Sequence, residues 1–106
     1  MDRPTPRLNS ARLGDYIGRN VRIVGKVISR DGDTVTLELS DKGQVQVKLN
    51  RDSNHRDAYV EVIGRVERLD LVQELTSCNM GDQIDMDLMD RVVELTHNFT
   101  DIFPTQ

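Results

Sequence analysis

Two seven-residue segments of this chain match position by position, and they constrain the fold more than any other feature. Residues 21–27 read VRIVGKV and residues 60–66 read VEVIGRV: valine, a charged residue, two aliphatic residues, glycine, a basic residue and valine. Apolar residues fall on both faces of each extended segment, which indicates burial on both faces. A glycine in mid-strand permits the sharp coil with which one strand serves two sheets. We therefore predict two corner strands of a small barrel.

Two further segments alternate apolar and polar side chains, as half-buried strands do. They are TVTLEL at residues 34–39 and QVQVKLN at residues 44–50. The turns at residues 30–33 and 41–43 each contain a glycine that can take a positive φ in a tight hairpin. Residues 71–80 predict a weaker closing strand.

The order of the strands favours one class of barrel. Residues 50–58 have no apolar periodicity and predict an exposed loop after the third strand. A three-stranded meander with glycine-bent first and fourth strands predicts an all-β fold, a five-stranded OB-fold Greek-key barrel with a short N-terminal helix and a C-terminal α-helix. Sm-like and SH3-like barrels are competitors, because the commonest OB fold has a helix between its third and fourth strands.

A chain of 106 residues is expected to form one domain around a modest core. Residues 1–7 contain two prolines and are expected to be a flexible N-terminal arm. Residues 8–80 are expected to form the OB-fold barrel, which begins with a short helix over residues 8–18. Asn9 is the predicted N-cap of that helix, and its buried side is predicted to contain Leu13, Tyr16 and Ile17. Residues 81–106 are expected to be a C-terminal oligomerisation helix.

Residues 84–104 predict an amphipathic helix with more apolar surface than a small barrel needs. Asp85 is the predicted N-cap, and Pro104 marks the end. At about 100° per residue, one apolar ridge contains Ile84, Leu88, Val92, Leu95, Phe99, Ile102 and Phe103. A second ridge contains Met86, Met89 and Val93. The two ridges cover about half of the circumference, whereas a helix that only covers the end of a barrel needs a stripe of about 100°.

The surplus apolar surface predicts a partner helix. The 4, 3, 4 spacing of Leu88, Val92, Leu95 and Phe99 is the seam by which helices pack in coiled coils and bundles. The remaining sector is polar and is predicted to face solvent: Asp87, Asp90, Arg91, Glu94, His97, Asn98 and Asp101. The alternative is that both ridges pack on the chain's own barrel.

The charge distribution argues against a strong nucleic-acid binder. Residues 1–68 carry 13 basic against 10 acidic side chains, whereas residues 69–106 carry 1 against 8, and the whole chain has a net charge of −4. Phosphate neutralisation normally requires a basic stripe, and the aromatic residues Tyr16, Tyr59, Phe99 and Phe103 lie away from the strands on which an OB fold stacks bases. The candidates for phosphate contacts are Lys26, Arg30, Lys48 and Arg51.

No pattern in the sequence predicts an enzyme, a metal site or a cofactor. Cys78 is the single cysteine, which excludes an internal disulfide, and it is predicted to be a core residue. His55 and His97 lack the spacing of metal ligands and are predicted to be surface residues. The chain also has no apolar run of the roughly 18 residues that a membrane span needs, and its start lacks a secretory signal. An intracellular, non-catalytic protein is expected.

The N-terminal helix, VRIVGKV, VEVIGRV and the ending THNFTDIFP at residues 96–104 together give a family resemblance. The chain resembles the smallest subunit of eukaryotic replication protein A over nearly its whole length. Two departures are Met89 and Asp90, where that family favours an aromatic residue and an asparagine, and residues 41–58 match only in their strand and loop pattern.

The resemblance implies a single OB fold without cofactor or metal, in a nuclear heterotrimer that binds single-stranded DNA in replication, repair and recombination. It implies two larger OB-fold subunits as partners, with DNA bound mainly through them. The C-terminal helix is expected to join helices of both partners in a three-helix bundle through Leu88, Met89, Val92, Val93, Leu95, Phe99 and Phe103. Two alternatives stay open: an autonomous OB-fold single-stranded nucleic-acid binding module, and the small subunit of a telomere-associated trimer.

Overall fold

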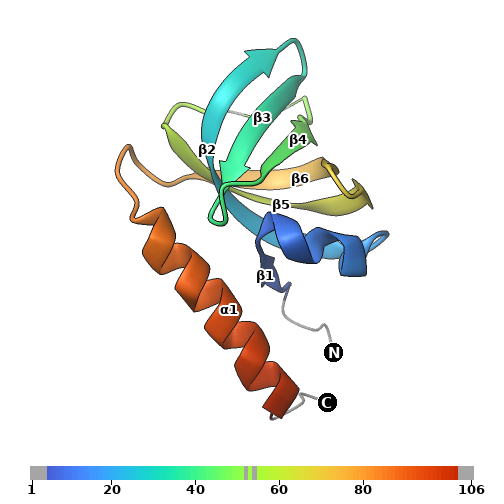
Figure 1. Cartoon of the computed structure of the whole chain (residues 1–106). Helices are drawn as coiled ribbons and strands as arrows, with labels where there is room; N and C mark the ends of the chain where they lie inside the picture. The colour runs from blue at the N-terminus through green and yellow to red at the C-terminus, as the bar shows by residue number, and fades with distance from the viewer. Residues whose placement is uncertain (1–4, 52, 54, 103–106) are drawn as a thin grey trace.

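The computed structural model describes residues 5–51, 53 and 55–102 of the chain, with side chains as far as residue 97. Figure 1 shows the strands gathered into a barrel, with one long helix running along and beyond one end of it. In chain order the elements are β1 (Arg7–Leu8), the 3-10 helix η1 (Ser10–Tyr16), β2 (Asn20–Asp31), β3 (Thr34–Leu39), β4 (Gln44–Lys48), β5 (Tyr59–Arg68), β6 (Leu71–Asn79) and α1 (Met86–Ile102).

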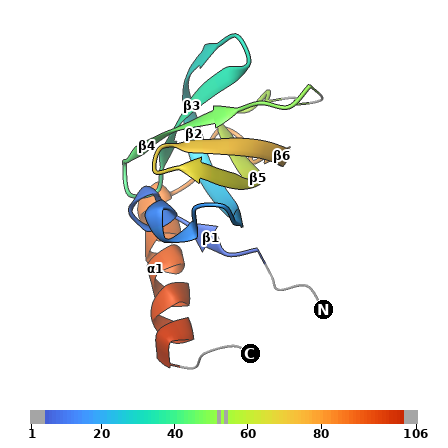
Figure 2. The same ribbon diagram turned by 90° about the vertical axis from the view of Figure 1, so that its right-hand side faces the viewer.

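The strands form one sheet that closes on itself. Their order is β1-β2-β3-β4-β6-β5, and β2 also pairs with β5. The β2–β3, β3–β4, β2–β5 and β5–β6 pairs are antiparallel, while β4 and β6 are parallel. Figure 2 shows the closed barrel with α1 and η1 at its lower end. The predicted OB-fold barrel, with helices near both ends of the chain, is confirmed.

The interior is built by apolar side chains from the strands and from η1, including the inward residues predicted by alternation in β3 and β4. The buried cluster contains Leu8, Leu13, Val21, Ile23, Val35, Leu37, Leu39, Val45, Val47, Val60, Val62, Val66 and Val72. Tyr16, Val27 and Leu49 pack against it from the margin. Most of these side chains are β-branched or leucine, which suits the narrow interior of a small barrel.

Both glycines of the matching segments allow a neighbouring strand to come close. Gly25 pairs with Leu39 of β3 and with Val60 of β5, so β2 belongs to both halves of the barrel, as predicted. A Cβ at Gly25 would lie 2.9 Å from the Cβ of Leu37. A Cβ at Gly64 would collide with the carbonyl of Gln73, beside a register shift in the β5–β6 pair.

The N-terminal region differs from the prediction in three ways. Arg7, expected in the flexible arm, belongs to β1, which pairs in parallel with β2. The short helix is a 3-10 helix, and the side chain of Asn9 does not cap it. Instead, Asp41 of the β3–β4 turn accepts hydrogen bonds from the backbone amides of Ser10 and Ala11 at 3.2 and 3.0 Å. Ile17, predicted to be buried, is exposed because the helix ends at Tyr16.

The two hairpin turns use their glycines differently. Gly32 has a φ of +63°, as predicted for the β2–β3 turn. In the β3–β4 turn the positive φ of 70° belongs to Lys42, so the prediction for Gly43 is wrong. A glycine is needed at position 43 because a Cβ there would collide with the side chain of Ser10.

We expect Gly64→Ala to lower the free energy of unfolding by about 1 to 3 kcal/mol, the usual cost of overpacking a well-packed site. The added methyl group would lie 2.7 Å from Cγ1 of Val72 as well as against the Gln73 carbonyl. Urea unfolding followed by circular dichroism measures the loss. Gln46→Ala, at an exposed position of β4, is the control and should stay within about 0.5 kcal/mol of wild type. Equal stability of the two variants would contradict the close approach.

Candidate partner-helix interface

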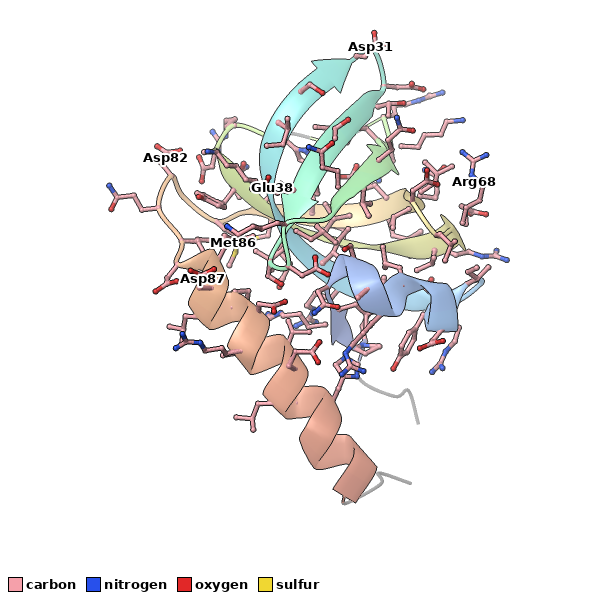
Figure 3. The ribbon with its side chains drawn as sticks, in the orientation of Figure 1. Asp31, Glu38, Arg68, Asp82, Met86 and Asp87 are labelled. Carbon is pink, nitrogen blue, oxygen red and sulfur yellow. The ribbon has the colours of Figure 1, made fainter. Side chains whose placement is uncertain are left out.

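Helix α1 begins at the predicted cap. The Asp85 carboxylate accepts a hydrogen bond from the backbone amide of Leu88 at 3.0 Å, and the Asp85 carbonyl accepts one from Met89 at 3.0 Å. Asp87 adds a negative charge to the first turn, where the helix dipole favours it. Figure 3 shows Met86 and Asp87 at the end of α1 that lies closest to the barrel.

The buried amide of Asn9 holds two carboxylates of α1. Its Nδ2 group donates to Asp90 Oδ1 at 2.9 Å and to Glu94 Oε2 at 2.8 Å. The hydroxyl of Ser40, which directly follows β3, donates to the same Asp90 oxygen at 2.9 Å. Asn9 is free for this role because Asp41 satisfies the first amides of η1 in its place.

Arg12 of η1 forms a two-point ion pair with Glu94. Its Nε donates to Glu94 Oε2 at 2.9 Å and its Nη2 to Glu94 Oε1 at 2.8 Å, the geometry in which guanidinium and carboxylate groups interact best. The hydrogen bonds from Arg12, followed by that from Asn9, lower the pKa of Glu94 from 4.5 to about 2 and outweigh its partial burial.

His97 extends the same contact along the helix. Its Nε2 group donates to the carbonyl of Arg7 at 3.0 Å. The ring meets that of Tyr16 edge to face, with centroids 6.2 Å apart. The prediction that His97 lies on the surface is therefore wrong, and so is the prediction that Asp90 and Glu94 face solvent, because both contact the barrel. Asp87 and Arg91 of the same predicted sector are exposed, as predicted.

The ridge with bundle spacing lies on the opposite side of α1 and is open. Leu88 is 55% exposed, Val92 42% and Leu95 68%. Asp90, Glu94 and His97 have the same 4, 3 spacing displaced by two residues, which is about 200° of rotation around the helix. Leu88, Val92 and Leu95 therefore do not pack on the chain's own barrel, and for them the alternative in which both ridges do so is contradicted.

The other predicted interface residues are placed differently. Val93 is only 1% exposed because it packs on the chain's own side of α1, so it is unavailable to a partner and this prediction is corrected. Met89 is half-buried at the margin between the two faces. Phe99 has no described side chain, and Phe103 lies outside the described residues.

The four cations suggested for phosphate contacts are all exposed: Lys26, Arg30, Lys48 and Arg51. Lys26 lies opposite Glu38 of β3, and Lys48 lies opposite Thr34, so both belong to the outer face of the barrel. Arg30 lies opposite Val35, a core residue, and therefore points to the other side of the sheet. Figure 3 shows Glu38, which pairs with Lys26, on β3 and Asp31, which follows Arg30, at the tip of the β2–β3 hairpin. An acidic residue is therefore a neighbour of each of these two cations.

A buried polar cluster was missed by sequence reasoning. His55 and Glu74 have side chains that are each 1% exposed, with His55 Nε2 2.9 Å from Glu74 Oε2 and 3.0 Å from the hydroxyl of Ser77. Glu74 also accepts from the backbone amide of Asn50 at 3.0 Å and from Ser53 Oγ at 3.1 Å. An acidic residue at an inward position of β6 was the only sequence signal, since Val72 and Glu74 share a face.

These hydrogen bonds hold the β4–β5 loop against the barrel. Burial raises the pKa of Glu74, but the hydrogen bonds from Asn50, Ser77 and His55 outweigh it and keep the pKa below its ordinary value. The prediction that His55 is a surface residue of an exposed loop is wrong because Glu74 provides a buried acceptor. Cys78, predicted in the core, is exposed and lies opposite Glu61 on the outer face of β6.

Within the part of the chain that the structure describes, no three histidine, cysteine or acidic side chains are grouped so that they could hold a metal ion. The described helices also include none that is long and apolar enough to cross a membrane.

We expect the Glu94 carboxyl to titrate near pH 2 in the wild-type chain and closer to 4.5 in Arg12→Ala, because the guanidinium stabilises the charged form. A folded-state pKa below the unfolded value means that this contact stabilises the fold above about pH 4.5 and is lost as the pH falls towards 2. Carboxyl chemical shifts in an NMR titration report the midpoint. A wild-type midpoint near 4.5 would contradict the ion pair.

We expect Glu74→Ala to lower the free energy of unfolding by about 3 kcal/mol or more, because it leaves His55, Ser53 and an amide buried without their acceptor. Thr76→Ala, at an exposed position of the same strand, is the control. Urea unfolding measures both variants. A loss below about 1 kcal/mol for Glu74→Ala would show that the loop does not depend on this carboxylate.

Comparisons with known proteins agree with this architecture. The chain is 30% identical to Replication factor A protein 3 of Schizosaccharomyces pombe, over 97% of this chain and 98% of that protein. It is 31% identical to a 14 kDa subunit of Replication protein A from Arabidopsis thaliana, over 89% of this chain and 88% of that protein.

Among solved structures, a chain of U. maydis Replication protein A bound to ssDNA superimposes with a TM-score of 0.89, 34% identity and coverage of 97% of this chain and 98% of that chain. The telomere capping protein Ten1 from Saccharomyces pombe superimposes with a TM-score of 0.73 over 90% of this chain and 99% of that one. With 15% identity, the second likeness shows a shared fold alone.

The family model described as Replication factor A protein 3 matches residues 1–103, which include the barrel and nearly all of α1. The chain therefore belongs to the Replication factor A protein 3 family, the smallest subunits of replication protein A.

Proposed function

We propose that this chain is a non-catalytic subunit that supports assembly of the replication protein A heterotrimer. In this proposal α1 joins one helix from each of the two larger subunits in a three-helix bundle. Membership of the family and the 34% identical chain in the U. maydis complex support a role in that complex. The complex would act in the nucleus, in DNA replication, repair and recombination.

The observation that carries the proposal is the open apolar ridge on a helix whose other side is already bound. Leu88, Val92 and Leu95 remain exposed while Val93 is buried. Full burial of an apolar side chain of this size stabilises an assembly by about 1.5 to 3 kcal/mol, so the three residues together can support a strong contact. Met89 would lie at the edge of that contact, and Phe99 and Phe103 would continue it.

Single-stranded DNA would be bound mainly by the larger subunits. The outer face of β3 and β4 presents the polar residues Thr34, Thr36, Glu38, Gln44, Gln46 and Lys48 and no aromatic side chain. Stacking on an aromatic ring is worth about 1 to 3 kcal/mol per base, and this face lacks it. Lys26, Arg30, Lys48 and Arg51 would add phosphate contacts at most.

We expect Leu88→Asp to weaken binding of the two larger subunits at least a hundredfold, or about 2.8 kcal/mol, because it places a charge in the buried seam. Co-elution of the three purified chains on a sizing column tests this, with affinities measured by titration. Circular dichroism should show an unchanged barrel.

Leu69→Asp is the matched control. Leu69 is an exposed leucine in the β5–β6 turn, and Figure 3 shows the neighbouring Arg68 well away from α1. This variant should co-elute like the wild type. Retained co-elution of Leu88→Asp would count against the bundle. A stable monomer that binds oligonucleotides tightly alone would favour an autonomous binding module, and recovery with telomere proteins instead would favour a telomere-associated trimer.

A further inference from the structure

Helix α1 contacts the barrel mainly through polar side chains, although the same helix carries an apolar ridge that could have packed there. Val93 is the one fully buried apolar side chain among the described residues of α1, although three apolar residues stand exposed on the opposite face. A half turn of the helix would bring that ridge onto the barrel. Something must therefore oppose this rotation.

The barrel side of the contact supplies hydrogen-bond donors that only the observed face of α1 can satisfy. Asn9 donates to both Asp90 and Glu94, and Arg12 donates twice to Glu94. Ser40 adds a fifth hydrogen bond, also to Asp90. Covering these donors with an apolar ridge would bury them without acceptors, which is costly. Hydrogen bonds are also directional, so they define one rotation of the helix, unlike an apolar contact.

We propose that Asn9 and Arg12 are positioning residues, which hold α1 by Asp90 and Glu94 in the one rotation that keeps Leu88, Val92 and Leu95 outward for the partner helices. The inference rests on the proposed bundle and deepens it. The helix is then pre-organised before assembly, and less conformational freedom is lost when the partners bind. The contact would influence affinity although none of its residues lies on the bundle seam.

Charge reversal tests this proposal, because exchanging the charges of Arg12 and Glu94 restores an ion pair between the same two positions. Arg12→Glu and Glu94→Arg are each expected to weaken binding of the co-purified pair of larger subunits at least tenfold. Each should also lose hydrogen-exchange protection at the backbone amides of residues 90–97 in the isolated chain. The double variant, with both reversals, should recover most of the affinity and of the protection.

Arg65→Glu is the control, since Arg65 is exposed on β5 and the change of charge equals that of Arg12→Glu. It should leave both readouts unchanged. Circular dichroism under the assay conditions should show a folded barrel in all variants, which separates a loss of positioning from unfolding. Failure of the double variant to recover would overturn the proposal.

The outcomes also separate this inference from the proposed function. If Leu88→Asp abolishes binding while both single reversals bind and exchange like the wild type, the positioning role is wrong and the bundle stands. If Leu88→Asp binds normally, the bundle is wrong. Unaltered exchange protection in the single reversals overturns the positioning role in either case.

Discussion

The two hydrogen bonds that the Asn9 amide donates to Asp90 and Glu94 connect the barrel to the helix through which we propose that it assembles. They exist because Asp41 caps η1 from the β3–β4 turn and leaves the Asn9 side chain free. The turn can come so close because Gly43 has no Cβ to collide with Ser10. A glycine in one hairpin thus helps to determine which face of a helix much further along the chain is open to partners.

The β4–β5 loop, like α1, is attached to the barrel by polar contacts. An OB fold usually has a helix after its third strand, whereas here a loop is attached by the buried pair of His55 and Glu74. A buried pair of this kind contributes little net stability compared with apolar packing, but removing one partner is costly. The loop is therefore held against the barrel by hydrogen bonds to one buried carboxylate.

The strands, the core and the cap of α1 could be predicted because each depends on neighbours in the sequence. The alternation in residues 34–39 and the spacing of Leu88, Val92 and Leu95 are visible in the chain itself. The burial of His55 and His97 could not be predicted in this way. Each is buried because a partner far away in the chain, Glu74 or the carbonyl of Arg7, satisfies its ring nitrogen.

The sequence by itself determined the barrel strands, the glycines in the two corner strands and an apolar ridge on the last helix, because periodicity and residue size act locally. Only the tertiary structure decided which face of that helix would meet the barrel. The residues that decide it, Arg12 and Glu94, are 82 positions apart. Ion pairs across such separations leave no periodic signal, and a polar sector has the same pattern whether water or a guanidinium group satisfies it.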